Sequence, residues 1–520
     1  MLPLRSILLN YVLYIQLCSQ DFKGTRLSAV VSFMDNNCVV GENKRTVPES
    51  KMSVCERIKL EGIDVIPARV EGMADVYQSP RFVLCKPRWI ADEEVTVCVL
   101  CSNKFNQLRR KHHCRQCGRV LCSKCCHEKI PMPQLGVEES ERVCESCRPI
   151  TELVTKSRSK IDSFLLEAAS GLCKRCQDPL FIKRVVELGG IQTLVALGSV
   201  DDANILRPVL DGLHTLSTHQ PLHHVLAESG AIKTVCSILG KVTESQEQLL
   251  IDGISSLRIF CKSADLKTKA LSDGALRPIL KLCTYQSEAI ALLALSTLSL
   301  IVEHPDTHDA IVDNALKALP RILALTMSSD EQTQEVALKT LAYLSCGSTW
   351  HRHRIVQEDF SSGDCLQNAL QRQSRNPQIM CNTACLVANL ATNTDDQTSL
   401  QPLMSCLCET LKSGVTHADL LCHISRGIAN FAKFKQNANI LKVYIPVIVK
   451  SCVKSSVPVV RANGMRAILS LLTFEPSETT TELMRDGAGD FLQGMGKIPG
   501  LIGSVQSSLL EHAPARVKPM

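Results

Sequence analysis

The sequence predicts a small metal-stabilised module followed by an all-α repeat domain, and three observations carry this prediction. Four Cys-x-x-Cys pairs lie between residues 98 and 147. From about residue 151 the apolar residues recur at helical spacing. Only 4% of the 520 residues are aromatic, which favours helix-rich packing over a β-sandwich. We therefore divide the chain into 1–85, without a dominant period, 86–150, rich in cysteine, and 151–515, helical.

The first region begins with an apolar run. Residues 1–18, MLPLRSILLNYVLYIQLC, resemble part of a targeting segment, but Asn10 and Gln16 interrupt the run and no clean cleavage site follows. The run is also short for a membrane span. We therefore expect residues 1–85 to be an accessory region and the rest of the chain to lie outside the membrane.

The cysteines of the second region are spaced as metal ligands. Each Cys-x-x-Cys pair lets two thiolates reach one ion, and eight soft ligands suffice for two tetrahedral zinc ions. A module of about 60 residues has little core, so metal binding should supply much of its folding free energy. The disulfide alternative needs an oxidising compartment. The predicted zinc ligands are Cys98, Cys101, Cys114, Cys117, Cys122, Cys125, Cys144 and Cys147.

The remaining cysteines are expected to be structural. Cys85 and Cys126 lie outside the four pairs, and thirteen more are scattered from Cys173 to Cys452. Within apolar helices such residues behave as small hydrophobes, which suits a reducing compartment. We interpret the pair Cys173 and Cys176 in the same way.

A cluster of positive charge lies among the zinc ligands. Residues 104–124 contain seven Lys or Arg and no Asp or Glu, whereas the net charge of the whole chain is only +6. The mild overall charge does not predict nucleic-acid binding, so any electrostatic function must be local. Arg grips phosphate oxygens through a planar fork, and this cluster therefore predicts a phosphate-bearing ligand.

Three motifs make residues 89–148 resemble the FYVE zinc finger. They are Trp89-Ile90-Ala91-Asp92, the basic stretch RKHHCRQCG at 110–118, and Arg142-Val143-Cys144. The resemblance implies short β-hairpins, a C-terminal helix and a two-zinc cross-brace. It further implies one ion on Cys98, Cys101, Cys122 and Cys125, and a second on Cys114, Cys117, Cys144 and Cys147.

The resemblance also implies that the finger binds phosphatidylinositol 3-phosphate on early endosomal membranes. Arg115, Arg142 and His113 would meet the 3-phosphate, and Arg110 and Lys111 the side of the 1-phosphate. Asp92 and His112 would contact ring hydroxyls beside Trp89, and the Asp92 carboxylate would repel lipids with further phosphates. Gln107 and Leu108 occupy the loop that enters the bilayer in this family. Because one Leu anchors weakly, a dimer or a second membrane contact would strengthen binding, although no heptad pattern predicts a dimer.

The third region contains an internal repeat. Its helix-opening turns place Ile191, Ile232, Leu276 and Leu316 at steps of 41, 44 and 40 residues. These units resemble armadillo repeats over about 165–500, with HEAT repeats as the alternative. The resemblance implies a solenoid that binds protein, in which asparagines of the third helices hold extended peptides. Only Asn389 and Asn430 match, so we do not expect a regular asparagine ladder.

Together these features predict a non-enzymatic, cytoplasmic adaptor, peripheral on the early endosome, that recruits a protein partner. Two alternatives are a RING-like ubiquitin ligase and an effector of Rab-type small GTPases. The first usually has Cys-x-His within its ligand run, and the second generally lacks the complete basic stretch. The sequence contains no P-loop, kinase motifs or nucleophile elbow to indicate an enzyme.

Overall fold

The computed structural model describes residues 57–72, 75–312, 317–372 and 374–485. The chain divides into two units, Met1–Val54 and Cys55–Met520, and all described residues lie in the second. The apolar run at residues 1–18 therefore lies outside the described residues.

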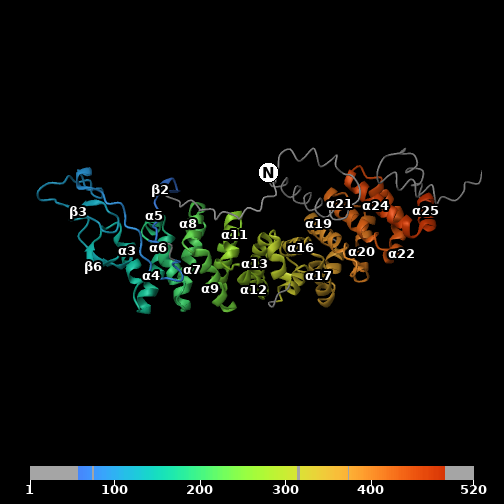
Figure 1. The fold of residues 1–520 in the computed structure, drawn as a ribbon, viewed down its shortest axis with the longest axis horizontal. Coiled ribbons are helices and arrows are strands. Elements are labelled where there is room, and N and C mark those ends of the chain that lie inside the picture. The colour runs from blue at the N-terminus through green and yellow to red at the C-terminus, as the bar shows by residue number, and fades with distance from the viewer. Residues whose placement is uncertain (1–56, 73–74, 313–316, 373, 486–520) are drawn as a thin grey trace, which may run out of the picture. The chain divides into compact units, whose positions relative to one another are not determined.

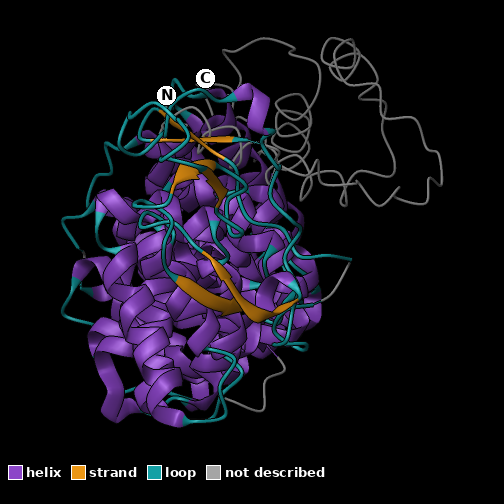
Figure 2. Cartoon of the chain, turned by 90° about the vertical axis from the view of Figure 1, so that its left-hand side faces the viewer, coloured by secondary structure: helices purple, strands orange, loops and turns teal. Residues whose placement is uncertain are grey.

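Short antiparallel hairpins precede the helices, and Figure 2 shows their strands in orange. The three pairs are β1 (Ile58–Leu60) with β2 (Ile63–Val65), β3 (Lys111–His113) with β4 (Val120–Cys122), and β5 (Lys129–Met132) with β6 (Val137–Arg142). Two 3₁₀ turns, η2 (Asp92–Glu94) and η3 (Pro133–Leu135), lie between them. The helix α3 (Arg148–Lys156) starts directly after Cys147 and has proline in its first turn, where the missing N–H costs nothing.

One row of long helices runs through the rest of the unit, each member packed on the next (Figure 1). We call it the third-helix row, and it consists of α4 (Asp162–Cys176), α7 (Ala203–Ser217), α10 (Glu247–Phe260), α13 (Glu288–Ile301), α16 (Glu331–Ser345), α19 (Pro377–Leu390), α21 (Ala418–Phe431) and α24 (Pro458–Phe474). The recurrence of one packing relation at a nearly constant interval is typical of a helical-repeat solenoid. The structure thus confirms the predicted fold class of short hairpins followed by an all-α repeat domain.

Shorter helices connect the members of this row. They are α5 (Pro179–Glu187), α6 (Gly190–Leu197), α8 (His223–Glu228), α9 (Ala231–Lys241), α11 (Ala264–Ser272), α12 (Leu276–Cys283), α14 (His308–Val312), α15 (Ala318–Leu325), α17 (Thr349–Ser361), α18 (Cys365–Gln371), α20 (Gln397–Lys412), α22 (Ala438–Leu441), α23 (Ile445–Ile448) and α25 (Pro476–Arg485). Five 3₁₀ turns at Gln220–Leu222, Glu244–Gln246, Pro305–Thr307, Lys435–Asn437 and Lys442–Tyr444 and a π turn at Val449–Val453 complete the described helical segments. Within the described ranges, none of the helices combines the length and the apolar character needed to cross a membrane.

The expected helix-opening turns explain how each repeat begins. Gly189, with φ at 87°, directly precedes α6 and has a left-handed backbone that favours glycine. The apolar anchors Ile191 and Ile232 then enter the core, where both are fully buried. Leu276 opens α12 with its side chain half-buried, and Leu316 lies outside the described residues.

A segment without sequence periodicity packs on the first repeats. The backbone N–H of Ala68 donates to Val186 O at 3.0 Å, and Gln192 Nε2 of α6 donates to Ala68 O at 2.9 Å. Further along, Lys233 Nζ of α9 pairs with Asp75 Oδ2 at 2.6 Å. The part of residues 57–85 that the structure describes is therefore joined to the helical repeats, and the backbone N–H of Leu84 also donates to Gln134 O of the finger at 2.8 Å.

We predict that burial in the third-helix row dominates the stability of the repeats. Leu298 of α13 is fully buried, so Leu298→Ala should lower the free energy of unfolding by about 2–5 kcal/mol. The matched control is Leu180→Ala at an 85% exposed position, where the change should stay within about 0.5 kcal/mol. Denaturant unfolding followed by circular dichroism measures both, and equal losses in the two variants would contradict this core.

Candidate metal centres and cationic site

Two groups of four cysteines meet in the finger, here residues 88–152. Within each group the sulfur atoms lie within 4.8 Å of one another. The groups are Cys98, Cys101, Cys122 and Cys125, and Cys114, Cys117, Cys144 and Cys147. They are the two ligand sets that the resemblance implies, and they alternate along the chain, first pair with third and second with fourth.

The donor sets fit zinc. A tetrahedral ion with Zn–S bonds of about 2.3 Å requires sulfur atoms about 3.8 Å apart. The sulfur atoms of Cys101 and Cys122 are 3.7 Å apart. Each group can therefore hold one zinc ion, which would supply a fixed coordination geometry and no redox chemistry.

Hydrogen bonds to sulfur support the thiolate form of the ligands. The backbone N–H of Cys122 donates to Cys98 Sγ at 3.5 Å, and that of Cys144 donates to Cys114 Sγ at 3.3 Å. Hydrogen bonds from the backbone and side chain of Asn103 lower the pKa of the Cys101 thiol to about 6. Such donors orient the ligands and favour the charge that a metal requires.

The cationic strand β3 lies between the two metal groups. Its partner strand β4 ends at Cys122 of the first group, and Cys114 of the second group follows β3 directly. The register pairs Lys111 with Cys122 and His113 with Val120. Both ends of the hairpin are thereby tied to cysteines that bind metal, so its side chains project from a fixed backbone.

The segment around Trp89 is fastened to this strand through His113. The indole of Trp89 stacks on the imidazole with ring centroids 4.1 Å apart and an interplanar angle of 14°. His113 Nε2 lies 2.8 Å from Ile90 O and 3.8 Å from Asp92 Oδ1. Lys111 Nζ donates to Asp92 O at 2.6 Å. Lys111 thus holds the backbone of Asp92 at the edge of the cationic strand, and the Asp92 carboxylate, which is about half exposed, lies close to His113.

Arg115 and Arg142 are held beside the same strand. The backbone N–H of Arg115 donates to Arg142 O at 2.8 Å, so the two residues are adjacent. The guanidinium of Arg115 lies 5.1 Å from the centroid of the Trp89 ring and 3.3 Å from Glu141 Oε1. Arg142 Nη1 donates to Cys126 O at 2.8 Å. Each guanidinium is therefore fixed through only part of its donor set.

The remaining predicted residues surround this centre. Arg110 is exposed, and His112 is half-buried at the middle of β3. Desolvation by burial lowers the pKa of His112, and the charges of Arg142 and Arg110 lower it further. The Leu108 side chain is 96% exposed in the loop before β3, next to the exposed Gln107.

Sequence reasoning missed two features of the site. Glu141 brings a carboxylate to Arg115, although it lies outside the basic stretch at residues 104–124. The feature of the sequence that could have indicated this contact is the position of Glu141 directly before Arg142. Gly118 adopts φ of 69°, and a Cβ atom there would lie 2.2 Å from Arg88 O. Only glycine allows this close approach, and Gly118 O in turn accepts a hydrogen bond from Ile90 N at 3.1 Å. Gly118 therefore lets the Trp89 segment pack against the hairpin of β3 and β4.

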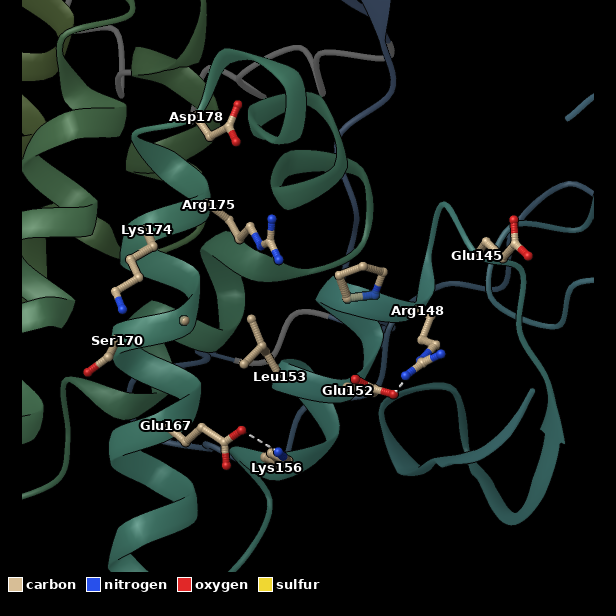
Figure 3. Close-up of a pocket in the computed structure, with 12 residues that line it drawn as sticks. Glu145, Arg148, Glu152, Leu153, Lys156, Glu167, Ser170, Lys174, Arg175 and Asp178 are labelled. Atoms are coloured by element: carbon tan, nitrogen blue, oxygen red, sulfur yellow. Dashed lines mark hydrogen bonds and ion pairs between the residues drawn. The ribbon is translucent and has the colours of Figure 1, made fainter. Parts of the chain in front are cut away.

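A cleft of about 760 Å³ lies between α3 and α4 (Figure 3). The ion pair between Lys156 and Glu167 spans it, and Arg148 pairs with Glu152 at 2.8 Å along α3. Its charged lining residues are balanced in sign: Arg148, Lys156, Lys174 and Arg175 against Glu145, Glu152, Glu167 and Asp178. A balanced lining does not favour a polyanionic ligand, so the unbalanced charge around β3 remains the candidate anion site.

Comparisons with known proteins agree with this geometry. Residues 88–152 match the family described as FYVE zinc finger, a lipid-binding domain. Over 60 residues the chain is 45% identical to the lateral signaling target protein 2 homolog of Brugia malayi and 47% identical to lateral signaling target protein 2 of Caenorhabditis briggsae. These matches cover 12% of this chain and 10% and 9% of the two relatives, respectively. The chain thus spans about a tenth of the length of the curated relatives it matches.

Two solved structures are similar to part of this chain. An engineered protein matches 70% of this chain and 98% of its own length, with a TM-score of 0.48 and 17% identity. A computationally designed armadillo repeat protein for modular peptide recognition matches 46% of this chain and 98% of its own length, with a TM-score of 0.38 and 16% identity.

We predict that loss of a single ligand removes zinc, whereas loss of a neighbouring thiol does not. Cys144→Ser should lower the zinc content of the purified chain from two ions to about one, because serine is a poor fourth ligand. The finger should also lose part of its folding free energy. Mass spectrometry of the metal content measures the first effect.

The matched control is Cys126→Ser. Cys126 is buried in the finger and donates to His113 O at 3.7 Å, but it belongs to neither four-sulfur group. This variant should keep two zinc ions. A two-ion content in Cys144→Ser, or a loss of zinc in Cys126→Ser, would reject the ligand assignment.

Proposed function

We propose that the chain is a non-enzymatic adaptor that binds phosphatidylinositol 3-phosphate on the cytoplasmic face of early endosomes and recruits a protein through its helical repeats. The observation that carries this proposal is the cationic strand β3, held at both ends by the four-sulfur groups, with the Trp89 segment fastened to it. A rigid cup of donors binds a phosphate without first having to be ordered.

The resemblance to the FYVE finger assigns a role to each of these side chains, and their positions support the assignment. Arg115, Arg142 and His113 are neighbours at one end of the site and would bind the 3-phosphate. Arg110 and Lys111, at the start of β3, would bind the 1-phosphate side. A partly free guanidinium fork can form two parallel hydrogen bonds to phosphate oxygens.

Asp92 and His112 would contact the ring hydroxyls. The Asp92 carboxylate is about half exposed and is held close to His113, at 3.8 Å. A phosphate in place of the nearby hydroxyls would face this negative charge, and the repulsion would select against more highly phosphorylated lipids.

Leu108 supplies the apolar part of membrane binding. Its side chain is almost fully exposed beside Gln107, so insertion would bury a surface that water now covers. One leucine contributes about 1.5–3 kcal/mol, whereas stable anchoring usually requires two signals. A homodimer or a membrane-bound partner of the repeats would provide the second contact.

We predict that Arg115→Ala weakens binding to liposomes containing phosphatidylinositol 3-phosphate by about 10- to 100-fold, because a charge-assisted hydrogen bond contributes about 1.5–3 kcal/mol. Cosedimentation with liposomes that carry each phosphoinositide isomer measures the effect. The loss should be largest for the 3-phosphate lipid.

The matched control is Arg148→Ala. Arg148 belongs to the finger but pairs with Glu152 and Glu128 outside the cationic site. Its substitution should leave lipid binding within about twofold, since exposed ion pairs contribute little. Equal binding of wild-type chain to all isomers would contradict the proposed headgroup.

We also predict that lipid binding strengthens as the pH falls. The pKa of His112 lies below its ordinary value of 6.5 in the free chain, so the imidazole is mostly neutral at neutral pH. Because the negative charge of the nearby headgroup favours the charged form of the imidazole, protonation and binding support each other, and the gain should continue below about pH 6.5. Cosedimentation at about pH 6 and about pH 8 compares the two states. A similar gain in His112→Asn would assign the effect to another group.

A further inference from the structure

A cysteine in the third-helix row is surrounded by cationic side chains. Cys385 lies on α19, which packs against α16 on one side and α21 on the other. The residue is half-buried, so part of it faces solvent. Neither of the zinc groups includes it.

Arg426 of α21 is fixed over this sulfur. Its Nη2 atom lies 3.5 Å from Cys385 Sγ and 3.2 Å from Cys385 O, and its Nη1 donates to Asn389 Oδ1 at 2.6 Å. The acceptors in these contacts are a sulfur, a carbonyl and an amide oxygen, none of which is a carboxylate. The positive charge of the guanidinium therefore acts on the sulfur without a neutralising acid in these contacts.

Asn389 keeps the arginine in this position. Its Nδ2 donates to Ser345 Oγ at 2.8 Å and lies 3.4 Å from Cys346 Sγ, both near the end of α16. Asn389 is almost fully buried. The amide thus connects three neighbouring helices and aims its oxygen at Arg426.

The other titratable groups around Cys385 lie on or next to the three helices α16, α19 and α21. Its electrostatic neighbours are Tyr343 of α16, Cys346 directly after α16, Cys381 of α19, and His423 and Arg426 of α21. Burial acts to raise the pKa of the Cys385 thiol, but the charges and hydrogen bonds of His423 and Arg426 outweigh it and lower the pKa to about 6.

The other twelve cysteines from Cys173 to Cys452 differ from Cys385. In each of them the pKa of the thiol is raised, with burial as the main cause. For example, burial raises the pKa of Cys283 to about 12. Thiols of this kind are unreactive, whereas a half-exposed sulfur beside cations is the reactive type.

We propose that Cys385 is a site of covalent modification by hydroperoxides and other soft electrophiles, held as a thiolate by Arg426 and His423. The site is a further property of the repeats and does not depend on lipid binding by the finger.

The reaction with hydrogen peroxide is a two-electron oxidation of the sulfur. Cys385 Sγ attacks one peroxide oxygen, so that an S–O bond forms while the O–O bond breaks. The sulfur becomes a sulfenic acid and the leaving oxygen departs as hydroxide. A proton from solvent converts that hydroxide to water. The peroxide named here is the oxidant, and no other reactant is needed.

The test measures how the reactivity of individual thiols depends on pH. The full-length, zinc-loaded chain is treated briefly with iodoacetamide from about pH 5 to about pH 9, and alkylation is quantified for each peptide by mass spectrometry. Cys385 should reach half of its maximal rate near pH 6. Cys406 is the control, because it is also half-buried but the pKa of its thiol is raised. The rate of its alkylation should therefore rise only above about pH 8.5.

Variants separate the cationic environment from general packing. Arg426→Gln and His423→Asn should each slow alkylation of Cys385 at pH 7, by about tenfold where the pKa rises from about 6 to about 8. Arg466→Gln is the matched control, because Arg466 makes similar contacts one repeat later, to Asn463 Oδ1 at 3.0 Å and Asn430 Oδ1 at 3.4 Å. It should leave the profile of Cys385 unchanged.

Peroxide followed by dimedone tests the oxidation itself. Dimedone should label Cys385 in the wild-type chain more than tenfold above Cys406, and the label should be lost in Cys385→Ser. Identical pH profiles for Cys385 and Cys406, or dimedone labelling of Cys385 no greater than that of Cys406, would overturn the proposal.

Discussion

Coordination of eight thiolates to two metal ions is the constraint on which the geometry of the finger depends. The two ligand sets alternate along the chain, so neither can form without closing a loop that contains ligands of the other. The hairpin of β3 and β4 lies within these loops, where β4 ends at Cys122 of one set, and Cys114 of the other directly follows β3. The basic side chains in and around this hairpin repel one another. Metal binding holds these charges together before any anion arrives.

The cationic site contains two acidic side chains that reduce its positive charge without neutralising it. Glu141 and the guanidinium of Arg115 are each more than a third exposed, and an exposed ion pair contributes at most about 1 kcal/mol. A phosphate that accepts hydrogen bonds from arginine gains about 1.5–3 kcal/mol for each bond, so it can displace Glu141. The carboxylate therefore orients the guanidinium in the free state. Asp92 has a different role in our proposal, because it would meet the ring hydroxyls, where repulsion would discriminate between ligands.

The sequence predicts those parts of the structure that follow from local spacing. The Cys-x-x-Cys pairs, the basic stretch and the glycine before α6 all act over a few residues, so the ligand pairs and the repeat turns could be predicted. The division of the pairs between two ions came from the family resemblance. The docking of residues 57–85 could not, because its contacts, such as that of Lys183 with Asp64 O, join residues 119 positions apart. The stack of Trp89 on His113 and the approach of Glu141 to Arg115 are also contacts between distant segments. Periodicity describes which face of an element is buried, but not which distant side chain meets it.

The two asparagines that match the armadillo pattern are occupied by the protein itself. Asn430 Nδ2 donates to Ala388 O at 2.9 Å, and its Oδ1 lies 3.4 Å from Arg466 Nη2. Asn389 is used in the same way by α16 and by Arg426. An amide whose donor and acceptor are both engaged inside the solenoid has little left for the backbone of a bound peptide. A partner that binds this part of the row would therefore contact the side chains around the asparagines. Cys385 is one of these neighbours, so its modification would change the surface that such a partner meets.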